Sequence, residues 1–73
     1  MTMNELRPGQ RAVVRAMDCG GTVRRRLRDL GLIEGAAVTC LGRSPLGDPI
    51  AYALSGAVIA LRRADSRRIE VEA

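Results

Sequence analysis

The residues that could do chemistry in this 73-residue chain are few, and arginine dominates them. All twelve basic residues are Arg, and the chain contains no Lys, no His and no Trp. A Walker A site and a Schiff base both need Lys, whereas the usual serine or cysteine triad and His-ligated zinc need His. We therefore predict that the chain is not an enzyme and has no small-molecule substrate.

The densest group of charges consists of Arg24, Arg25, Arg26 and Arg28. The first turn of a helix favours anions because the helix macrodipole is positive there, so folding alone does not account for three consecutive arginines. Three interpretations remain open, namely a solvated helix face, a surface for an acidic protein, and a site for phosphate or nucleic acid. We predict a partner-binding surface here.

A second candidate surface is a short loop rich in proline and glycine. Its residues are Pro45, Leu46, Gly47, Asp48 and Pro49. Two prolines restrict the backbone and place an apolar side chain at the tip, which lowers the entropic cost of docking on a protein. The alternative is a hairpin connection that only fixes the strand register.

Potential metal ligands are sparse. Asp18 and Cys19 form the one adjacent pair of donors, which makes them weak candidates for a transition-metal site. Cys40 lies in an apolar segment and is expected to be buried, whereas Cys19 precedes two glycines and is expected to be exposed.

The N-terminal segment has no apolar run typical of a signal peptide, and the longest charge-free stretch, residues 49–61, is too short to span a bilayer. We therefore expect a cytoplasmic chain without membrane insertion, in which both cysteines are free thiols.

Glycine and proline divide the chain into short segments of the kind that form one small barrel. In the first strand Ala12, Val14 and Ala16 should share one face. The predicted architecture is a single domain over residues 1–73, mainly β, with five short strands in an SH3-like or OB-like barrel. The expected strands cover residues 10–17, 36–42, 50–55, 57–61 and 68–72.

One helix is expected after the first strand. Thr22 is a suitable N-cap, and Gly31 suits the left-handed position that follows a helix end at Leu30. Val23, Leu27 and Leu30 follow a helical period and predict a narrow apolar stripe against the core.

Three segments read together resemble the FeoA family. Residues 24–35 resemble its RRL-x-[DE]-[LM]-G-[LI]-x-x-G signature, residues 44–50 its P-L-G-D-P loop, and residues 59–71 its closing ALR-x-x-[DE]-A-x-x-I-x-V pattern. Ser66 departs from that last pattern, in which alanine is usual.

The resemblance implies an SH3-like barrel and a partnership with FeoB, a membrane iron transporter that has a cytosolic GTPase domain. It also implies weak binding of ferrous or another transition-metal ion, although no cofactor is required. Two alternatives remain, which are a metal-responsive module like the C-terminal domain of iron-dependent repressors and a basic barrel that binds nucleic acid. The absence of stacking aromatics disfavours binding to nucleic acid.

The positive charge is unevenly distributed along the chain. Residues 1–30 hold seven arginines and three acidic residues, whereas residues 31–73 hold five of each. The net charge of +4 therefore belongs to the first strand and the helix, which predicts one basic face.

Overall fold

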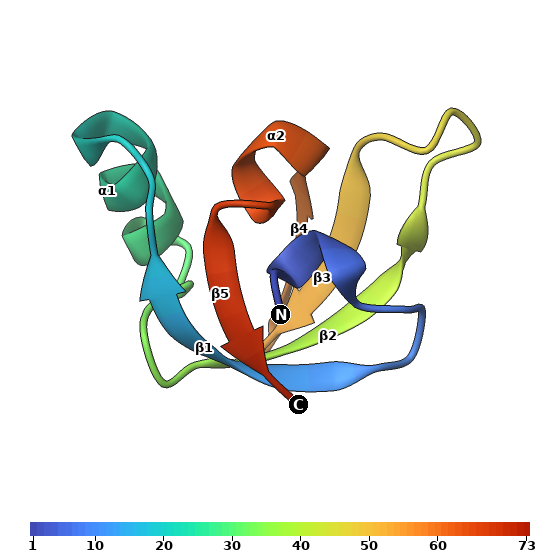
Figure 1. Cartoon of the computed structure of the whole chain (residues 1–73), viewed down its shortest axis with the longest axis horizontal. Coiled ribbons are helices and arrows are strands. Elements are labelled where there is room, and N and C mark those ends of the chain that lie inside the picture. The colour runs from blue at the N-terminus through green and yellow to red at the C-terminus, as the bar shows by residue number, and fades with distance from the viewer.

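The computed structural model describes residues 1–73 as a five-stranded antiparallel sheet with two short helices and one 3₁₀ turn (Figure 1). Five strands with one helix after the first strand were predicted, and both features are confirmed. In chain order the elements are η1 (Met3–Glu5), β1 (Arg11–Met17), α1 (Gly21–Asp29), β2 (Ala37–Arg43), β3 (Ile50–Leu54), β4 (Ala57–Leu61), α2 (Arg63–Ser66) and β5 (Ile69–Glu72).

The strands lie in the order β4-β3-β2-β1-β5, and the sheet curls into a partly open barrel (Figure 1). β3 shows the predicted alternation, since Ile50, Tyr52 and Leu54 are buried while Ala51 and Ala53 face outward. Such a period of two is what a strand with one buried face requires.

Tyr52 is the one aromatic residue and lies fully buried in the core. Its hydroxyl donates a hydrogen bond of 3.2 Å to the carbonyl oxygen of Met3, which is itself buried. Because a buried phenol needs a partner, this bond fixes η1 against the barrel interior.

The N-terminal residues were not predicted to contribute to the core. Thr2 forms an isolated bridge with Glu70, and the Val71 N–H donates to the carbonyl oxygen of Met1 at 2.8 Å. The side chains of Met3 and Leu6, which come next in the chain, are buried in the core. This segment therefore covers the outer edge of β5.

The predicted placement of Ala16 on one face with Ala12 and Val14 is wrong, because a bulge interrupts β1. The pairing with β5 shifts between Val14 and Ala16, so the alternation of faces restarts one residue later. As a result Ala16 is exposed and Met17 is buried opposite Ile69.

The predicted N-cap of α1 is also displaced. The helix begins at Gly21 with Gly20 as the N-cap, and the Arg24 N–H donates to the Gly20 carbonyl oxygen at 2.9 Å. Thr22 therefore lies inside the first turn, and no side chain caps the helix.

The C-terminal end of α1 follows the prediction for Gly31, which has φ +96°. The N–H groups of Gly31 and Leu32 donate to the carbonyl oxygens of Arg28 and Leu27, which is the Schellman arrangement. Leu32 thereby becomes fully buried beside the buried Leu27, whereas Leu30, expected in the core, remains 47% exposed.

We expect Tyr52→Phe to lower the free energy of unfolding by about 1 kcal/mol, because the Met3 carbonyl loses one of its two donors and keeps only the Leu6 N–H. Urea denaturation measures the change as a lower midpoint with an unchanged slope. Leu46→Ala is the control, since Leu46 is 94% exposed and should leave the midpoint unchanged. An unchanged midpoint in Tyr52→Phe would contradict the role given to the hydroxyl.

Gly21, at the start of α1, and Gly31, just after its end, should respond in opposite directions to alanine. Gly31→Ala should destabilise by roughly 1 kcal/mol, because φ is +96° and a side chain strains that conformation. Gly21→Ala should stabilise by about 0.5–1 kcal/mol, because Gly21 is helical and a Cβ there meets nothing within 4 Å. Thermal unfolding of the two variants checks the opposite signs.

Candidate functional site

The arginines of α1 form an exposed surface that we call the basic helix surface, consisting of Arg24, Arg25, Arg26 and Arg28. Arg24 is the only one with an ion-pair partner, at 3.4 Å from the Glu34 carboxylate. The chain contains no ion pair between Arg25 and Asp29, although their spacing would allow one. The guanidinium groups of Arg25, Arg26 and Arg28 therefore have no ion-pair partner within the chain and are available to bind another protein.

A small niche lined by both charged and apolar side chains adjoins the basic helix surface. Its volume is about 220 Å³, and Arg24 and Arg28 border it together with Glu34. Among its apolar residues Leu32 and Met17 are buried, whereas Ile33 is 47% exposed. Arginines beside an exposed isoleucine suit a protein segment that carries both an apolar and an acidic side chain.

The loop over residues 45–49 has the turn predicted for it. The Gly47 N–H donates to the Ser44 carbonyl oxygen at 2.8 Å, and Leu46 projects into solvent with 94% exposure. The Asp48 carboxylate accepts a hydrogen bond of 2.8 Å from the Arg63 N–H, at the start of α2. Asp48 therefore anchors the loop, while Leu46 is the side chain that the loop presents.

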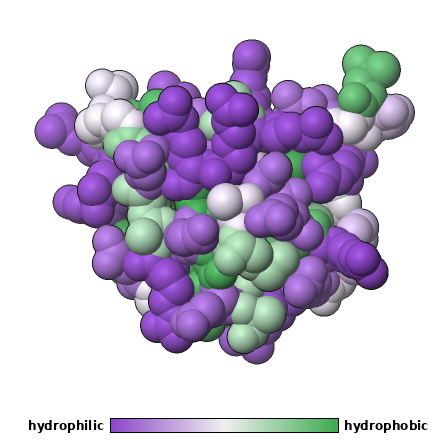
Figure 2. All heavy atoms as spheres, viewed as in Figure 1, coloured by the Kyte–Doolittle hydropathy of each residue, from purple (hydrophilic) through white to green (hydrophobic).

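The two predicted surfaces do not adjoin one another. α1 lies at one end of the long axis of the molecule and the β2–β3 loop at the other, with η1 and α2 between them (Figure 1). The Cα extents are 29 × 24 × 22 Å. In the same view most of the surface between the two ends is hydrophilic (Figure 2).

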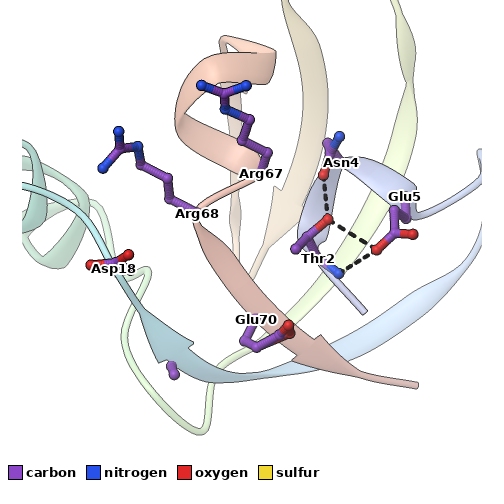
Figure 3. A pocket seen from close by; sticks show the side chains of 8 residues that line it. Thr2, Asn4, Glu5, Asp18, Arg67, Arg68 and Glu70 are labelled. Atoms are coloured by element: carbon purple, nitrogen blue, oxygen red, sulfur yellow. Dashed lines mark hydrogen bonds between the residues drawn. The ribbon is translucent and has the colours of Figure 1, made fainter.

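Sequence reasoning missed the largest cleft, which has a volume of about 790 Å³ (Figure 3). Arg67 and Arg68 line it without any ion-pair partner. Its other lining residues come from η1 and the adjoining Thr2, from the end of β1 and from β5, namely Thr2, Asn4, Glu5, Ala16, Asp18 and Glu70. Only the Arg67-Arg68 pair was visible in the sequence, because segments from both ends of the chain build the cleft.

A hydrogen bond orders one wall of this cleft. The Thr2 N–H donates to the Glu5 carboxylate at 2.7 Å (Figure 3), and this bond lowers the pKa of Glu5. Glu5 is thus held as an anion at the rim opposite Arg68. Because the walls of the cleft carry both positive and negative side chains, they do not select one class of ligand.

Cys19 is half-buried and packs against the core, which differs from the predicted exposure, whereas Cys40 is buried as predicted. Burial raises the pKa of the Cys19 thiol, and Asp65 raises it further. The chain contains no group of three or more His, Cys, Asp or Glu side chains that could hold a metal ion. Asp18 and Cys19 therefore do not fit a resident metal site, which needs more ligands and a deprotonated thiol.

The family model of the FeoA domain matches residues 1–73. The chain belongs to the FeoA family. It is 35% identical over 72 residues to an Fe(2+) transport protein A/Fe(2+) transporter FeoB fusion protein of Porphyromonas gingivalis. This match includes 99% of the chain and only 8% of the fusion protein.

Solved structures of the family share the fold. FeoA protein from Chlorobium tepidum is 42% identical with a TM-score of 0.95, over 99% of this chain and 69% of that one. FeoA of Stenotrophomonas maltophilia, complexed with zinc and described as an SH3 domain protein, is 32% identical with a TM-score of 0.82, over 99% and 89% of the two chains. The predicted SH3-like fold is therefore confirmed. No helix is long and apolar enough to cross a membrane.

The raised pKa of Cys19 predicts slow alkylation near neutral pH. The alkylation rate should reach half its maximum at a pH above that of a free cysteine, because the thiolate is the reactive form. Asp65→Asn should lower this midpoint, since a negative charge near the thiol is removed. Asp29→Asn is the control without effect, and mass spectrometry distinguishes adducts on Cys19 from those on buried Cys40. A midpoint at or below that of free cysteine would contradict the prediction.

Proposed function

We propose that this FeoA-family chain is a non-enzymatic accessory protein of ferrous iron uptake that docks on the cytosolic part of a FeoB-type transporter. The observation that carries the proposal is the similar FeoA-FeoB fusion protein, in which both parts belong to one polypeptide. Fusion of two parts in one relative supports association of the separate parts in another.

The covalent link in a fusion protein lowers the affinity that the contact between the two parts must provide. In a fusion the second part is present at an effective concentration of roughly millimolar, set by the linker. A separate chain has no such assistance and depends on its own surface. The basic helix surface fits this demand, because Arg28, which has no ion-pair partner, borders the niche together with Arg24 and Ile33.

Arginine and apolar side chains together are typical of protein interfaces, where a desolvated anchor is surrounded by charged or polar contacts. A phosphate backbone would engage the arginines but would gain nothing from the exposed Ile33 in the niche. The composition of the surface therefore favours an acidic protein segment over nucleic acid.

The loop over residues 45–49 supplies the second contact in this proposal. Leu46 projects from a turn held by the Ser44–Gly47 hydrogen bond, so docking orders few additional atoms. α1 and the loop lie at opposite ends of the long axis of 29 Å, so a partner must extend across this face of the chain to contact both.

Charge reversal on the basic helix surface tests the docking. We expect the triple variant Arg24→Glu, Arg25→Glu and Arg28→Glu to bind the cytosolic region of the FeoB-type transporter at least about tenfold more weakly, a loss of about 1.4 kcal/mol. Added salt should weaken the wild-type complex and have less effect on the variant. Isothermal titration at two salt concentrations measures both effects.

The matched control is Arg7→Glu, Arg11→Glu and Arg62→Glu, which changes the net charge equally at exposed residues outside α1. This control should keep most of the affinity, and Leu46→Asp should reduce it separately. Absence of binding by the wild-type chain would contradict the proposed function. Equal losses in the two triple variants would contradict the assignment to α1, and a salt-dependent shift of DNA mobility at similar affinity would favour the nucleic-acid alternative.

A further inference from the structure

The two edge strands of the sheet differ in whether another segment of the chain covers their backbone groups. The edge strand β5 is covered, since Thr2 bridges to Glu70 and the Val71 N–H donates to the Met1 carbonyl oxygen. The other edge strand, β4, pairs with β3 alone. An uncovered edge offers unpaired backbone groups to another strand.

The register of the β3–β4 hairpin identifies these unpaired groups. Leu54 and Ala57 flank the two-residue turn and exchange hydrogen bonds, and pairs alternate from there between bonded and non-bonded. Val58 and Ala60 fall in the non-bonded pairs, so their N–H and C=O groups point away from β3. No backbone group of β4 makes a hydrogen bond outside the sheet.

β4 also lacks the features that usually block edge pairing. Its sequence, AVIAL, contains no charge and no proline, and its register with β3 is continuous, in contrast to the bulges in β1 and β2. Val58 is 69% exposed, and Ala57 and Ala60 are exposed as well. The strand is therefore open both along its backbone and on its outer face.

We propose that β4 pairs antiparallel with β4 of a second copy of this chain. A two-fold axis at Ile59 sets Val58 of each copy opposite Ala60 of the other. The outward N–H and C=O groups of these residues then satisfy one another, and their small apolar side chains make contact across the junction. The same patch meets itself, as an isologous interface requires.

The charges at the ends of β4 agree with self-pairing. Arg62 and Arg63 follow the strand, and Ser55 and Gly56 precede it. In the antiparallel register Arg62 of one copy lies opposite Gly56 of the other. The two Arg62 residues are then about six residues apart along the strand direction, roughly 20 Å, which exceeds the Debye length of about 10 Å at 0.1 M salt. Like charges therefore do not oppose the pairing, whereas a parallel pairing would bring them together.

Sedimentation equilibrium of the reduced chain over a wide concentration range tests the proposal. We expect a weak monomer–dimer equilibrium, because the shared strand is five residues long. Amide hydrogen exchange supplies a residue-specific measurement. Protection of the Val58 and Ala60 amides should rise with protein concentration, while that of Ile59 and Leu61, already bonded to β3, should not.

Substitutions in β4 distinguish pairing through this strand from other modes of dimerisation. Ala60→Pro removes an outward N–H that has no partner within the chain and should abolish the dimer, and Val58→Lys should do the same by placing a charge at the junction. Circular dichroism confirms that each variant is folded. Leu30→Lys is the matched control, because Leu30 is an exposed apolar residue at the end of α1, away from β4.

Loss of the dimer in both edge variants with its retention in Leu30→Lys is the expected result. A chain that stays monomeric at the highest concentration, with unchanged exchange at Val58 and Ala60, would overturn the proposal. So would dimers that persist in both folded edge variants, or that disappear equally in Leu30→Lys. These results are independent of FeoB binding, since β4 contains no residue of the basic helix surface.

Discussion

The hydrogen bond from the Tyr52 hydroxyl to the Met3 carbonyl oxygen is the contact on which most of this small structure depends. A chain of this size has a marginal core, and its one aromatic side chain is the largest of those that are fully buried. The ring fills the barrel while the hydroxyl holds η1 against it. Because η1 is held there, Thr2 reaches Glu70, one edge of the sheet is covered and one wall of the large cleft forms.

α1 is held against the barrel by a small number of apolar side chains. The helix contributes the buried Leu27 and the partly buried Val23 to the core, and Leu32 follows through the reversal at Gly31. This narrow apolar contact leaves the remaining circumference of the helix in solvent. Four arginines can therefore be exposed together. The predicted placement of three of them in the first turn is wrong, because the helix begins earlier than expected and Arg26 and Arg28 lie in its last turn, where the macrodipole favours cations.

Charge counted along the sequence does not translate directly into charge on a face. Arg15, in the basic half of the chain, forms an ion pair with Glu72 from the neutral half. Arg24 similarly contacts Glu34, while Arg67 and Arg68 line a cleft without ion-pair partners. The predicted single basic face is therefore reduced to the basic helix surface, and a second group of unpaired arginines lies elsewhere.

The sequence by itself determined the features that depend on neighbours in the chain. The alternation around Tyr52 predicted β3, the Ser44–Gly47 segment predicted its turn, and Gly31 predicted the end of α1. These predictions succeed because strand faces, turns and helix caps are set within a few residues. The family signature followed from the same local patterns.

Only the tertiary structure decided the features that depend on distant segments. The bulge that exposes Ala16 arises from pairing with β5, and the burial of Met3 arises from Tyr52, 49 residues later. The separation of α1 from the β2–β3 loop, and the contrast between a covered β5 and an open β4, likewise come from the closure of the barrel. Local pattern cannot specify such pairings, because their energies come from contacts between segments that the sequence keeps far apart.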